Sequence, residues 1–330
     1  MRRPMILSVP LLFAGLISTA LVATSLSAEP LPVKTIEQKA DSVARTMKYN
    51  IVLPADYDAS TDRYPVLYLL HGLTSNYTAW AYMNVPQVAA NYKLIIVMPD
   101  VGNSWYVNWA ESGAGQKNQW EDYIIKDLIP HVDATYRTMA RREARAINGL
   151  SMGGYGAMTL GLRHPDMFCS IGSHSGALAF AERSAESVVQ GEQPDFLRRE
   201  WPGEVNPKIK IDGFSSPAER TPKGKIFTSQ EQCDAHDPFK LVLAVDRAQL
   251  PYIYVDCGTD DGLITSNHRF CRLLLEKNIP FTYGQSKGGH VPPYWAREVA
   301  QSIAVQNLII ERSLAQAAKA AKQAGDAAGN

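Results

Sequence analysis

Residues 149–153 read Gly-Leu-Ser-Met-Gly, and they lie between a short expected strand at 145–148 and a segment with helical spacing at 152–163. Small residues two positions before and after Ser151 let the backbone turn sharply from a strand into a helix without steric clashes. The serine hydroxyl then projects above the sheet, where the positive end of the helix favours developing negative charge. The stretch predicts Ser151 as a nucleophile. The alternative is a tight strand-to-helix turn with a capping serine.

Apolar runs typical of central strands recur on both sides of this turn. They cover residues 47–53, 66–70, 94–98, 168–173, 252–256 and 281–285. Amphipathic stretches at 121–136, 266–277 and about 293–312 alternate with them, and Pro130 is expected to kink or shift the first. Strands that are apolar on both faces and alternate with helices favour a mostly parallel, doubly wound α/β sheet.

Candidate partners for Ser151 follow it in the chain. Serine is a poor nucleophile until a base accepts its proton, and on this layout an acid and then a histidine come after the serine. His290 follows two glycines directly after the last expected strand, so a loop delivers its imidazole to the edge of the sheet. The acid is expected at the end of the preceding strand, where Asp256, Asp260 and Asp261 are candidates. We favour Asp261, with Asp260 in reserve, to hold the imidazole's tautomer and stabilise the imidazolium.

A tetrahedral intermediate needs backbone N–H groups that are in place before the substrate arrives. We expect one from Met152, next to the nucleophile, and one from Leu73, in the loop after His71-Gly72. His71 itself is interpreted as structural.

Aromatic residues near these motifs have two open interpretations. Trp105, Tyr106 and Trp295 either line an acyl or sugar pocket or pack their own loops. The sequence favours neither.

The two ends and one internal region stand apart from the expected hydrolase domain at 29–312. Residues 1–28 have a positive start, an apolar stretch and small residues before Glu29, which is the layout of a secretory signal peptide. Residues 313–330 are Ala-rich and are expected to fray into a flexible tail. Residues 177–237 are rich in Pro, Gly, Ser and charge, and are interpreted as an irregular insertion or lid over the active-site edge.

Composition excludes some classes of partner. Acidic and basic residues number 33 each, so the chain gives no electrostatic reason to expect a nucleic-acid partner. The four cysteines form no C-x-x-C pair, which argues against a zinc or dithiol site, and we expect zero or one disulfide. No metal and no cofactor is expected. The protein is predicted to be secreted or periplasmic, without stable membrane insertion after cleavage, and its oligomeric state stays open.

Over roughly residues 43–310, the chain resembles the esterase D-like family of α/β-hydrolases. The resemblance rests on residues 63–72 (Arg-Tyr-Pro-Val-Leu-Tyr-Leu-Leu-His-Gly), the Ser151 turn, residues 257–261 (Cys-Gly-Thr-Asp-Asp) and residues 288–290 (Gly-Gly-His). That family includes tributyrin, feruloyl and acetylxylan esterases, S-formylglutathione hydrolases and mycolyltransferases. It implies a carboxylester hydrolase without a cofactor, whose Ser, Asp and His match Ser151, Asp261 and His290.

The leading hypothesis is a secreted serine carboxylesterase that acts on a small-molecule or glycan-linked ester. One alternative is an acyltransferase that passes the acyl group to a sugar or other alcohol. A second is a catalytically silent glycan-binding protein on a hydrolase scaffold, since a fold alone does not fix function.

Overall fold

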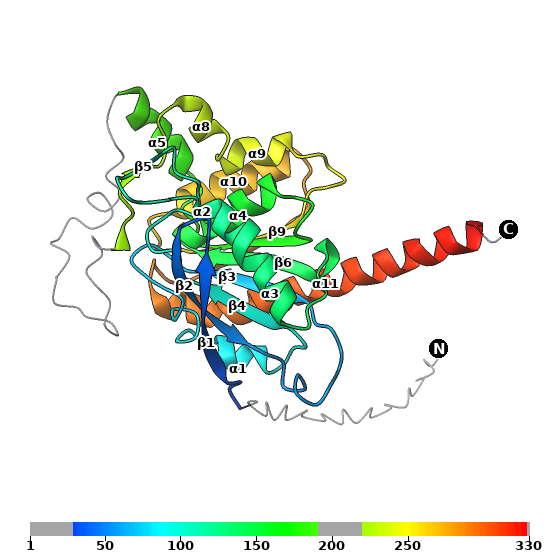
Figure 1. Cartoon of the computed structure of the whole chain (residues 1–330). Helices are drawn as coiled ribbons and strands as arrows, with labels where there is room; N and C mark the ends of the chain where they lie inside the picture. Colours follow the sequence, from blue (N-terminus) through cyan, green and yellow to red (C-terminus); the bar gives the residue numbers. More distant parts are fainter. Residues whose placement is uncertain (1–28, 191–219, 329–330) are drawn as a thin grey trace, which may run out of the picture.

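The computed structural model of the chain describes residues 29–190 and 220–328. The expected signal peptide at 1–28 lies outside the described residues, and so does the middle of the expected insertion. In the described part, an eight-stranded sheet runs through the centre of the molecule in the order β1-β2-β4-β3-β6-β7-β9-β10 (Figure 1). Its strands are β1 (Val33–Ala40), β2 (Arg45–Val52), β3 (Val66–Leu70), β4 (Ile95–Pro99), β6 (Arg145–Leu150), β7 (Ser170–His174), β9 (Tyr252–Gly258) and β10 (Phe281–Ser286).

Pairing in this sheet is mixed at one side and parallel over the rest. β1 pairs with β2, and β2 with β4, in antiparallel fashion, whereas every pair from β4 to β10 is parallel. The expectation of a mostly parallel α/β sheet is therefore confirmed. β3, β4, β6 and β7 are buried along their whole length, which explains why their sequences lack an alternating pattern.

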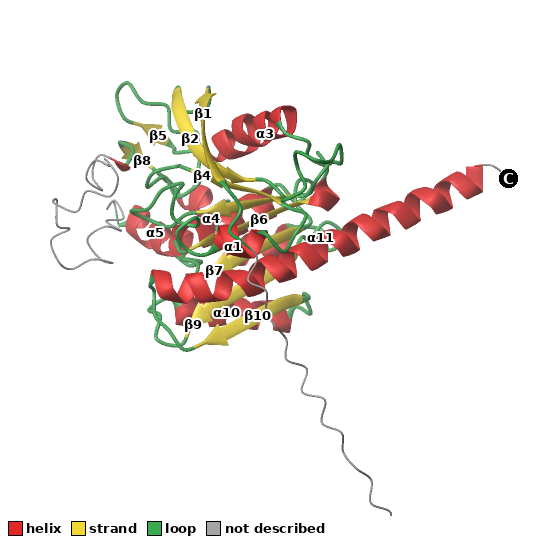
Figure 2. Ribbon diagram, turned by 90° about the horizontal axis from the view of Figure 1, so that it is seen from below, coloured by secondary structure: helices red, strands yellow, loops and turns green. Residues whose placement is uncertain are grey.

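Helices cover both faces of the sheet. On one face lie α1 (Val85–Ala89) and the long α11 (Pro292–Ala328), with their own apolar cluster. The other face carries α2 (Trp120–Asp122), the π-helical segment η1 (Tyr123–Leu128), α3 (Ile129–Thr135), α4 (Met152–Arg163) and α10 (Ile264–Glu276), packed in a larger cluster. Figure 2 shows α11 running across the sheet and projecting beyond it. A short 3-10 turn, η2 (Arg142–Ala144), precedes β6.

Part of the expected insertion is regular. Within 177–237 the structure has α5 (Phe180–Val189), β8 (Gly224–Lys225) and α8 (Gln230–Asp234), and α9 (Pro238–Ala244) follows directly. α5 and α8 lie side by side, and β8 pairs with β5 (Glu111–Ser112) in a separate two-stranded sheet (Figure 1). The sequence analysis missed these helices because they are short and embedded in polar sequence.

Helical segments were expected at 121–136 and 293–312, and only the end of the second needs correction. The stretch at 121–136 is one helical segment in three parts, and Pro130 lies in the first turn of α3 after the wider π-helical turns. Proline has no N–H to donate, so it fits where the regular hydrogen-bond ladder has been interrupted. The last helix does not end near Arg312. It continues to Ala328, because its Ala, Lys and Gln residues have high helix propensity.

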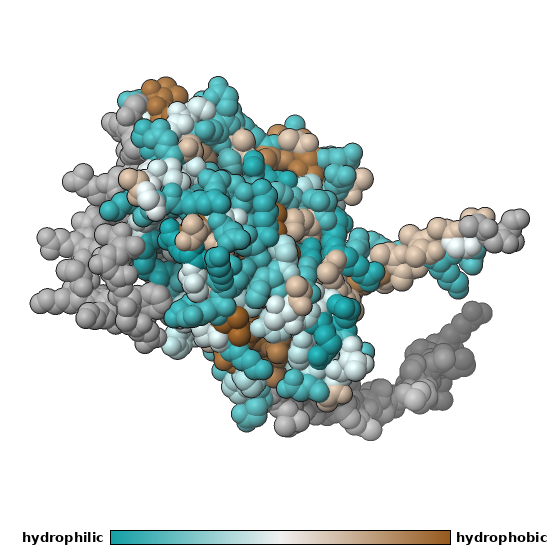
Figure 3. Space-filling view, viewed as in Figure 1, coloured by the Kyte–Doolittle hydropathy of each residue, from teal (hydrophilic) through white to brown (hydrophobic). Residues whose placement is uncertain are grey.

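The hydropathy of the surface is consistent with apolar side chains being packed between the sheet and its helices (Figure 3). The face shown in Figure 3 is mostly hydrophilic, and its apolar patches are small and separate. Within the described ranges, no helix combines the length and apolar character needed to cross a bilayer.

Candidate active site

Ser151 occupies the sharp turn between β6 and α4. Its φ of 54° and ψ of −116° are unusual for a residue with a side chain. A Cβ on Gly149 would lie 2.3 Å from the carbonyl oxygen of Gly153, and a Cβ on Gly153 would lie 2.3 Å from that of Leu70. Both glycines are therefore required by close backbone approach, as the motif predicted.

The structure brings Ser151, His290 and Asp261 into a hydrogen-bonded chain. The Ser151 Oγ lies 2.9 Å from Nε2 of His290, and Nδ1 of His290 lies 2.9 Å from Oδ2 of Asp261. An ionised carboxylate only accepts hydrogen bonds, so Nδ1 carries a proton toward Asp261. In the neutral imidazole, Nε2 is then free to accept the proton of the Ser151 hydroxyl. The three side chains come from the ends of β6, β9 and β10, at the carboxyl edge of the sheet.

Asp261 suits the role of the acid better than its neighbours. Its carboxylate is almost fully buried, and Oδ1 accepts a hydrogen bond from the backbone N–H of Leu263 at 2.8 Å. Burial acts to raise the pKa of Asp261, but the hydrogen bond and the charge of His290 outweigh it, so the pKa lies below its usual value. The reserve candidate, Asp260, is exposed, and Asp256 is buried beside a different histidine.

The sequence analysis expected the oxyanion amides at Leu73 and Met152. Leu73 belongs to residues 71–75, here called the oxyanion loop, and it lines the same pocket as Ser151. Met152 is the first residue of α4, where helix amides have no partner within the helix. Within the described ranges, neither N–H donates a hydrogen bond to another residue. Their role as oxyanion donors stays a prediction.

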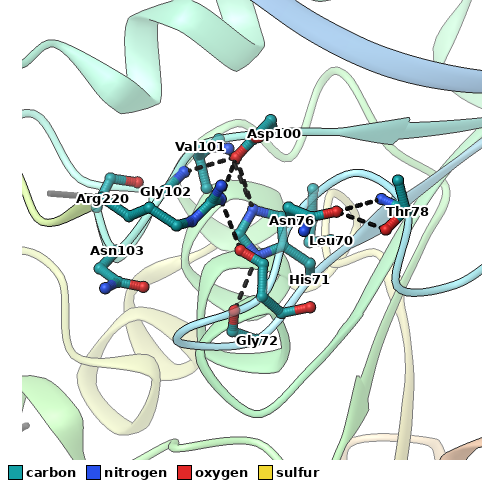
Figure 4. Close-up of polar contacts among 12 residues, drawn as sticks. Leu70, His71, Gly72, Asn76, Thr78, Asp100, Val101, Gly102, Asn103 and Arg220 are labelled. Carbon is teal, nitrogen blue, oxygen red and sulfur yellow. Dashed lines mark hydrogen bonds and ion pairs between the residues drawn. The ribbon is translucent and has the colours of Figure 1, made fainter. Parts of the chain in front are cut away.

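The oxyanion loop is held by hydrogen bonds from the chain after β4 (Figure 4). His71 donates from Nδ1 to the carbonyl of Gly72 at 2.8 Å, and its Nε2 accepts from the Val101 N–H at 3.1 Å. Asn103 accepts from the Thr74 N–H at 2.7 Å. Both ring nitrogens of His71 are thus occupied by backbone groups, which agrees with a structural role.

A pocket of about 590 Å³ opens over Ser151 and His290. Its described lining is mainly apolar, and includes Leu73, Met83, Leu150, Leu263, Pro292 and Trp295. Trp295 also packs edge-on against the His290 ring, with 4.9 Å between centroids. The apolar part of this lining suits the hydrocarbon portion of an acyl or aryl group next to the serine, and Arg183 also lines the pocket.

Trp105 and Tyr106 do not line this pocket. Trp105 is buried and stacks on Phe180, with 3.6 Å between ring centroids. Tyr106 is fully buried, and its hydroxyl donates to the carbonyl of His71 at 2.9 Å. In the described structure both residues pack the loop after β4, which is one of the two interpretations that the sequence left open.

The sequence analysis missed a second arrangement of the same residue types. His174 Nδ1 lies 2.6 Å from Asp256 Oδ2, and its Nε2 lies 2.8 Å from the Ser302 Oγ. All three residues are at most 1% exposed, between the sheet and α11. Ser302 belongs to an ordinary helix, so nothing in its local sequence marks this contact.

No cluster of His, Cys, Asp or Glu suited to a metal ion occurs among residues 29–190 and 220–328. The four cysteines are buried and unpaired, and burial raises the pKa of each thiol. They are therefore poor nucleophiles compared with exposed thiolates.

The sheet order, the Ser151 turn and the His290–Asp261 pair together define an enzyme scaffold of the α/β-hydrolase class. A family model described as "Putative esterase" matches residues 40–304. The chain belongs to this esterase family, which confirms the resemblance to esterase D-like proteins.

Individual relatives agree with this assignment. Esterase Rv1288 of Mycobacterium tuberculosis is 29% identical over 73% of this chain and 52% of its own length. An acetyl esterase of Caldicellulosiruptor saccharolyticus is 25% identical over 74% of this chain and 84% of its own. A solved ferulic acid esterase is 25% identical, with a TM-score of 0.64 over 85% of this chain and 99% of its own. The chain thus spans about half the length of the mycobacterial relative.

Proposed function

We propose that this chain is a serine carboxylesterase that hydrolyses small acyl or aryl esters, with Ser151 as nucleophile, His290 as base and Asp261 as orienting acid. The observation that carries the proposal is the hydrogen-bonded chain from Ser151 Oγ through His290 to Asp261, with 2.9 Å at each link. Membership of the esterase family and the pocket beside the serine support it.

In the first half-reaction, Ser151 Oγ attacks the ester carbonyl carbon while Nε2 of His290 takes the hydroxyl proton. The carbonyl oxygen becomes an oxyanion, which the N–H groups of Leu73 and Met152 stabilise. The intermediate collapses, the bond to the alcohol breaks, and the alcohol leaves with the proton from His290.

In the second half-reaction, His290 takes a proton from water as the water attacks the acyl-enzyme. The second tetrahedral intermediate releases the carboxylic acid, and the proton returns to Ser151 Oγ. No metal or organic cofactor takes part in this proposal. Its substrates are small-molecule or glycan-linked esters.

The test is hydrolysis of an ester panel by the protein and its Ser151→Ala variant. The panel holds short-chain and long-chain nitrophenyl esters, methyl ferulate and acetylated xylan. We expect Ser151→Ala to lower kcat by at least about 10³-fold, because the nucleophile acts as one unit with its base. Circular dichroism should show that the variant is folded. Undiminished turnover in folded Ser151→Ala would contradict the proposal.

The same assay separates the rival functions. Adding acceptor alcohols to the panel gives only free acid if the chain is a hydrolase, and transesterified product if it transfers acyl groups. If the protein hydrolyses no ester of the panel and binds saturably to an insoluble glycan, the alternative of a catalytically silent glycan-binding protein would be favoured.

We also propose export, which rests on the charge and apolar pattern of residues 1–28. N-terminal sequencing of protein expressed with its full sequence should find the mature start near Glu29. A start at Met1 would contradict export with cleavage.

A further inference from the structure

We propose that the ion pair between Arg220 and Asp100 is a positioning device, which holds the oxyanion loop in the shape that the proposed ester hydrolysis needs. The inference rests on the proposed function and adds two residues to it. Neither residue lines the pocket, so both act through the loop and not on the substrate.

Arg220 joins the oxyanion loop to the chain after β4. Its Nη2 donates to the carbonyl of Ser75 and to Oδ1 of Asp100, both at 2.7 Å (Figure 4). The two charged side chains are only 9% and 14% exposed. In such a setting a charged donor to a backbone carbonyl is stronger than a neutral one, and its direction is fixed by the partner carboxylate.

Asp100 is the centre of this arrangement. Its Oδ1 accepts the Gly102 N–H at 2.9 Å and lies 3.5 Å from Nε2 of His71, at the other end of the loop. Burial acts to raise the pKa of Asp100, but the charge of Arg220 and the hydrogen bond from the Gly102 N–H act to lower it, and the pKa lies below its usual value. The carboxylate therefore stays ionised and holds Arg220 at neutral pH.

The loop itself needs such support. Thr74 has a φ of 62°, which is unfavourable for a β-branched residue and persists only where the surroundings enforce it. Its N–H is bound by Asn103, and the Asn103 N–H is in turn bound by the carbonyl of Arg220 at 3.1 Å. Leu73 lies between these fixed points. The direction of the Leu73 N–H therefore depends on two contacts of Arg220. One is the contact of its side chain with the Ser75 carbonyl, and the other is the contact of its own carbonyl with the Asn103 N–H.

The experiment compares Arg220→Gln and Asp100→Asn with a matched control pair. Arg145 and Asp133 form an ion pair of the same 2.7 Å length and similar burial, and Arg145 also donates to a backbone carbonyl, that of Met167. Arg145 begins β6, at the end of the strand remote from Ser151. Steady-state kinetics on a neutral nitrophenyl ester and thermal unfolding are measured for every variant.

We expect Arg220→Gln to lower kcat by about 10-fold to 100-fold with little change in KM, since displacing an oxyanion donor costs less than deleting one. Arg220→Lys should recover part of kcat. Arg145→Gln should lower the melting temperature and leave kcat unchanged. An unchanged kcat in Arg220→Gln, or an equal loss in both arginine variants, would overturn the inference. The proposed function is tested separately, by comparing the activity of the parent with that of Ser151→Ala.

A different observation carries a second inference about the pocket wall. We infer that Arg183, on α5, forms an anion subsite beside Ser151, so that esters with a carboxylate on the acyl group are favoured substrates. Arg183 lines the pocket, whereas the carboxylate of Asp261 there is committed to His290. Among the described residues, the Arg183 side chain has no ion-pair or hydrogen-bond partner.

The surroundings strengthen the attraction for an anion. The rest of the described pocket wall is mainly apolar, and Arg183 is exposed, so its guanidinium is accessible to a ligand in the pocket. The neighbouring acid on α5, Glu182, is held by Arg269 at 3.0 Å. A planar guanidinium binds a carboxylate through two parallel hydrogen bonds.

The test is the ratio of kcat/KM for the mono-4-nitrophenyl ester of succinic acid to that for 4-nitrophenyl acetate. Arg183→Gln should lower this ratio about 10-fold, and Arg183→Glu should lower it further, because a binding cation is replaced by a repelling charge. Arg272→Gln is the control, since Arg272 is an exposed arginine of α10 that lies outside this pocket, and the Arg269–Glu182 pair stays intact. A ratio that is the same in Arg183→Glu and the parent would overturn the anion subsite while leaving the esterase proposal intact.

Discussion

Ser151 has a backbone conformation that its sequence neighbours make available and its spatial neighbours enforce. Gly149 and Gly153 leave room for the turn, and the Ser151 N–H is bound by the carbonyl of His174 at 2.9 Å. Because the first requirement is local, the motif alone predicted the turn. The choice between Asp260 and Asp261 is not local, since adjacent loop residues face opposite ways. Only the folded loop shows that Asp261 is the one that turns inward to His290.

At this scale we predict that Asp261→Asn lowers kcat by about 10³-fold to 10⁴-fold without unfolding the protein. The amide can still accept the Leu263 N–H, but it no longer selects the His290 tautomer that leaves Nε2 unprotonated. The measurement is kcat on a nitrophenyl ester at constant pH. Asp260→Asn is the control and should retain most activity. If Asp260→Asn lost more kcat than Asp261→Asn, Asp260 would be the acid that orients His290.

At the scale of elements, strands buried on both faces could be predicted from the sequence, whereas the polar edge strand β1 could not. β3 was expected at 66–70 and has those bounds, because five consecutive apolar residues fit only a buried strand of that length. β1 was missed because its eight residues are mostly exposed and polar, and its strand form depends on antiparallel pairing with β2. The same reasoning applies to α5, whose buried side rests on partners such as Trp105 that are distant in sequence.

α9 gives a prediction at this scale. Asp237 is its N-cap and accepts the Phe239 N–H at 2.9 Å, yet burial raises the pKa of Asp237 to about 6. The folded state thus holds this proton more tightly than the unfolded chain, whose aspartate pKa is about 3.9. The stabilisation is fully present below about pH 4, and it is lost as pH rises through about 6.

Asp237→Asn keeps the capping acceptor and has no charge to bury. As the pH rises from 4 to 7, we expect the free energy of unfolding of this variant to increase relative to that of the parent. The increase is on the order of 1 kcal/mol after allowance for solvent screening. Urea unfolding across this pH range measures the gain. Asp234→Asn is the control, because the Lys240 and Gln230 hydrogen bonds lower the pKa of this exposed carboxyl. A gain independent of pH would contradict the burial of charge at Asp237.

At the scale of the whole molecule, the layers decide which serine can react. Ser151, His290 and Asp261 meet at the carboxyl edge of the sheet, where the pocket opens. Ser302, His174 and Asp256 have comparable distances but lie beneath α11, where each residue is at most 1% exposed to solvent. Distances alone do not define a catalytic site. The ligand also needs a path to the nucleophile and amides to receive the oxyanion.

This difference predicts opposite outcomes for two chemically identical substitutions. Ser302→Ala should keep kcat within about 3-fold of the parent and lower stability by about 2–3 kcal/mol, because its hydroxyl contacts three buried partners: Asn148, His174 and the Val299 carbonyl. Ser151→Ala should do the reverse, since the Ser151 hydroxyl contributes to chemistry while the Ser302 hydroxyl joins α11 to β6 and β7 through Asn148 and His174. Kinetics and urea unfolding on both variants measure the two effects together. A loss of turnover in stable, folded Ser302→Ala would mean that the buried network transmits more than packing to the Ser151 turn, to which the His174 carbonyl is already bonded.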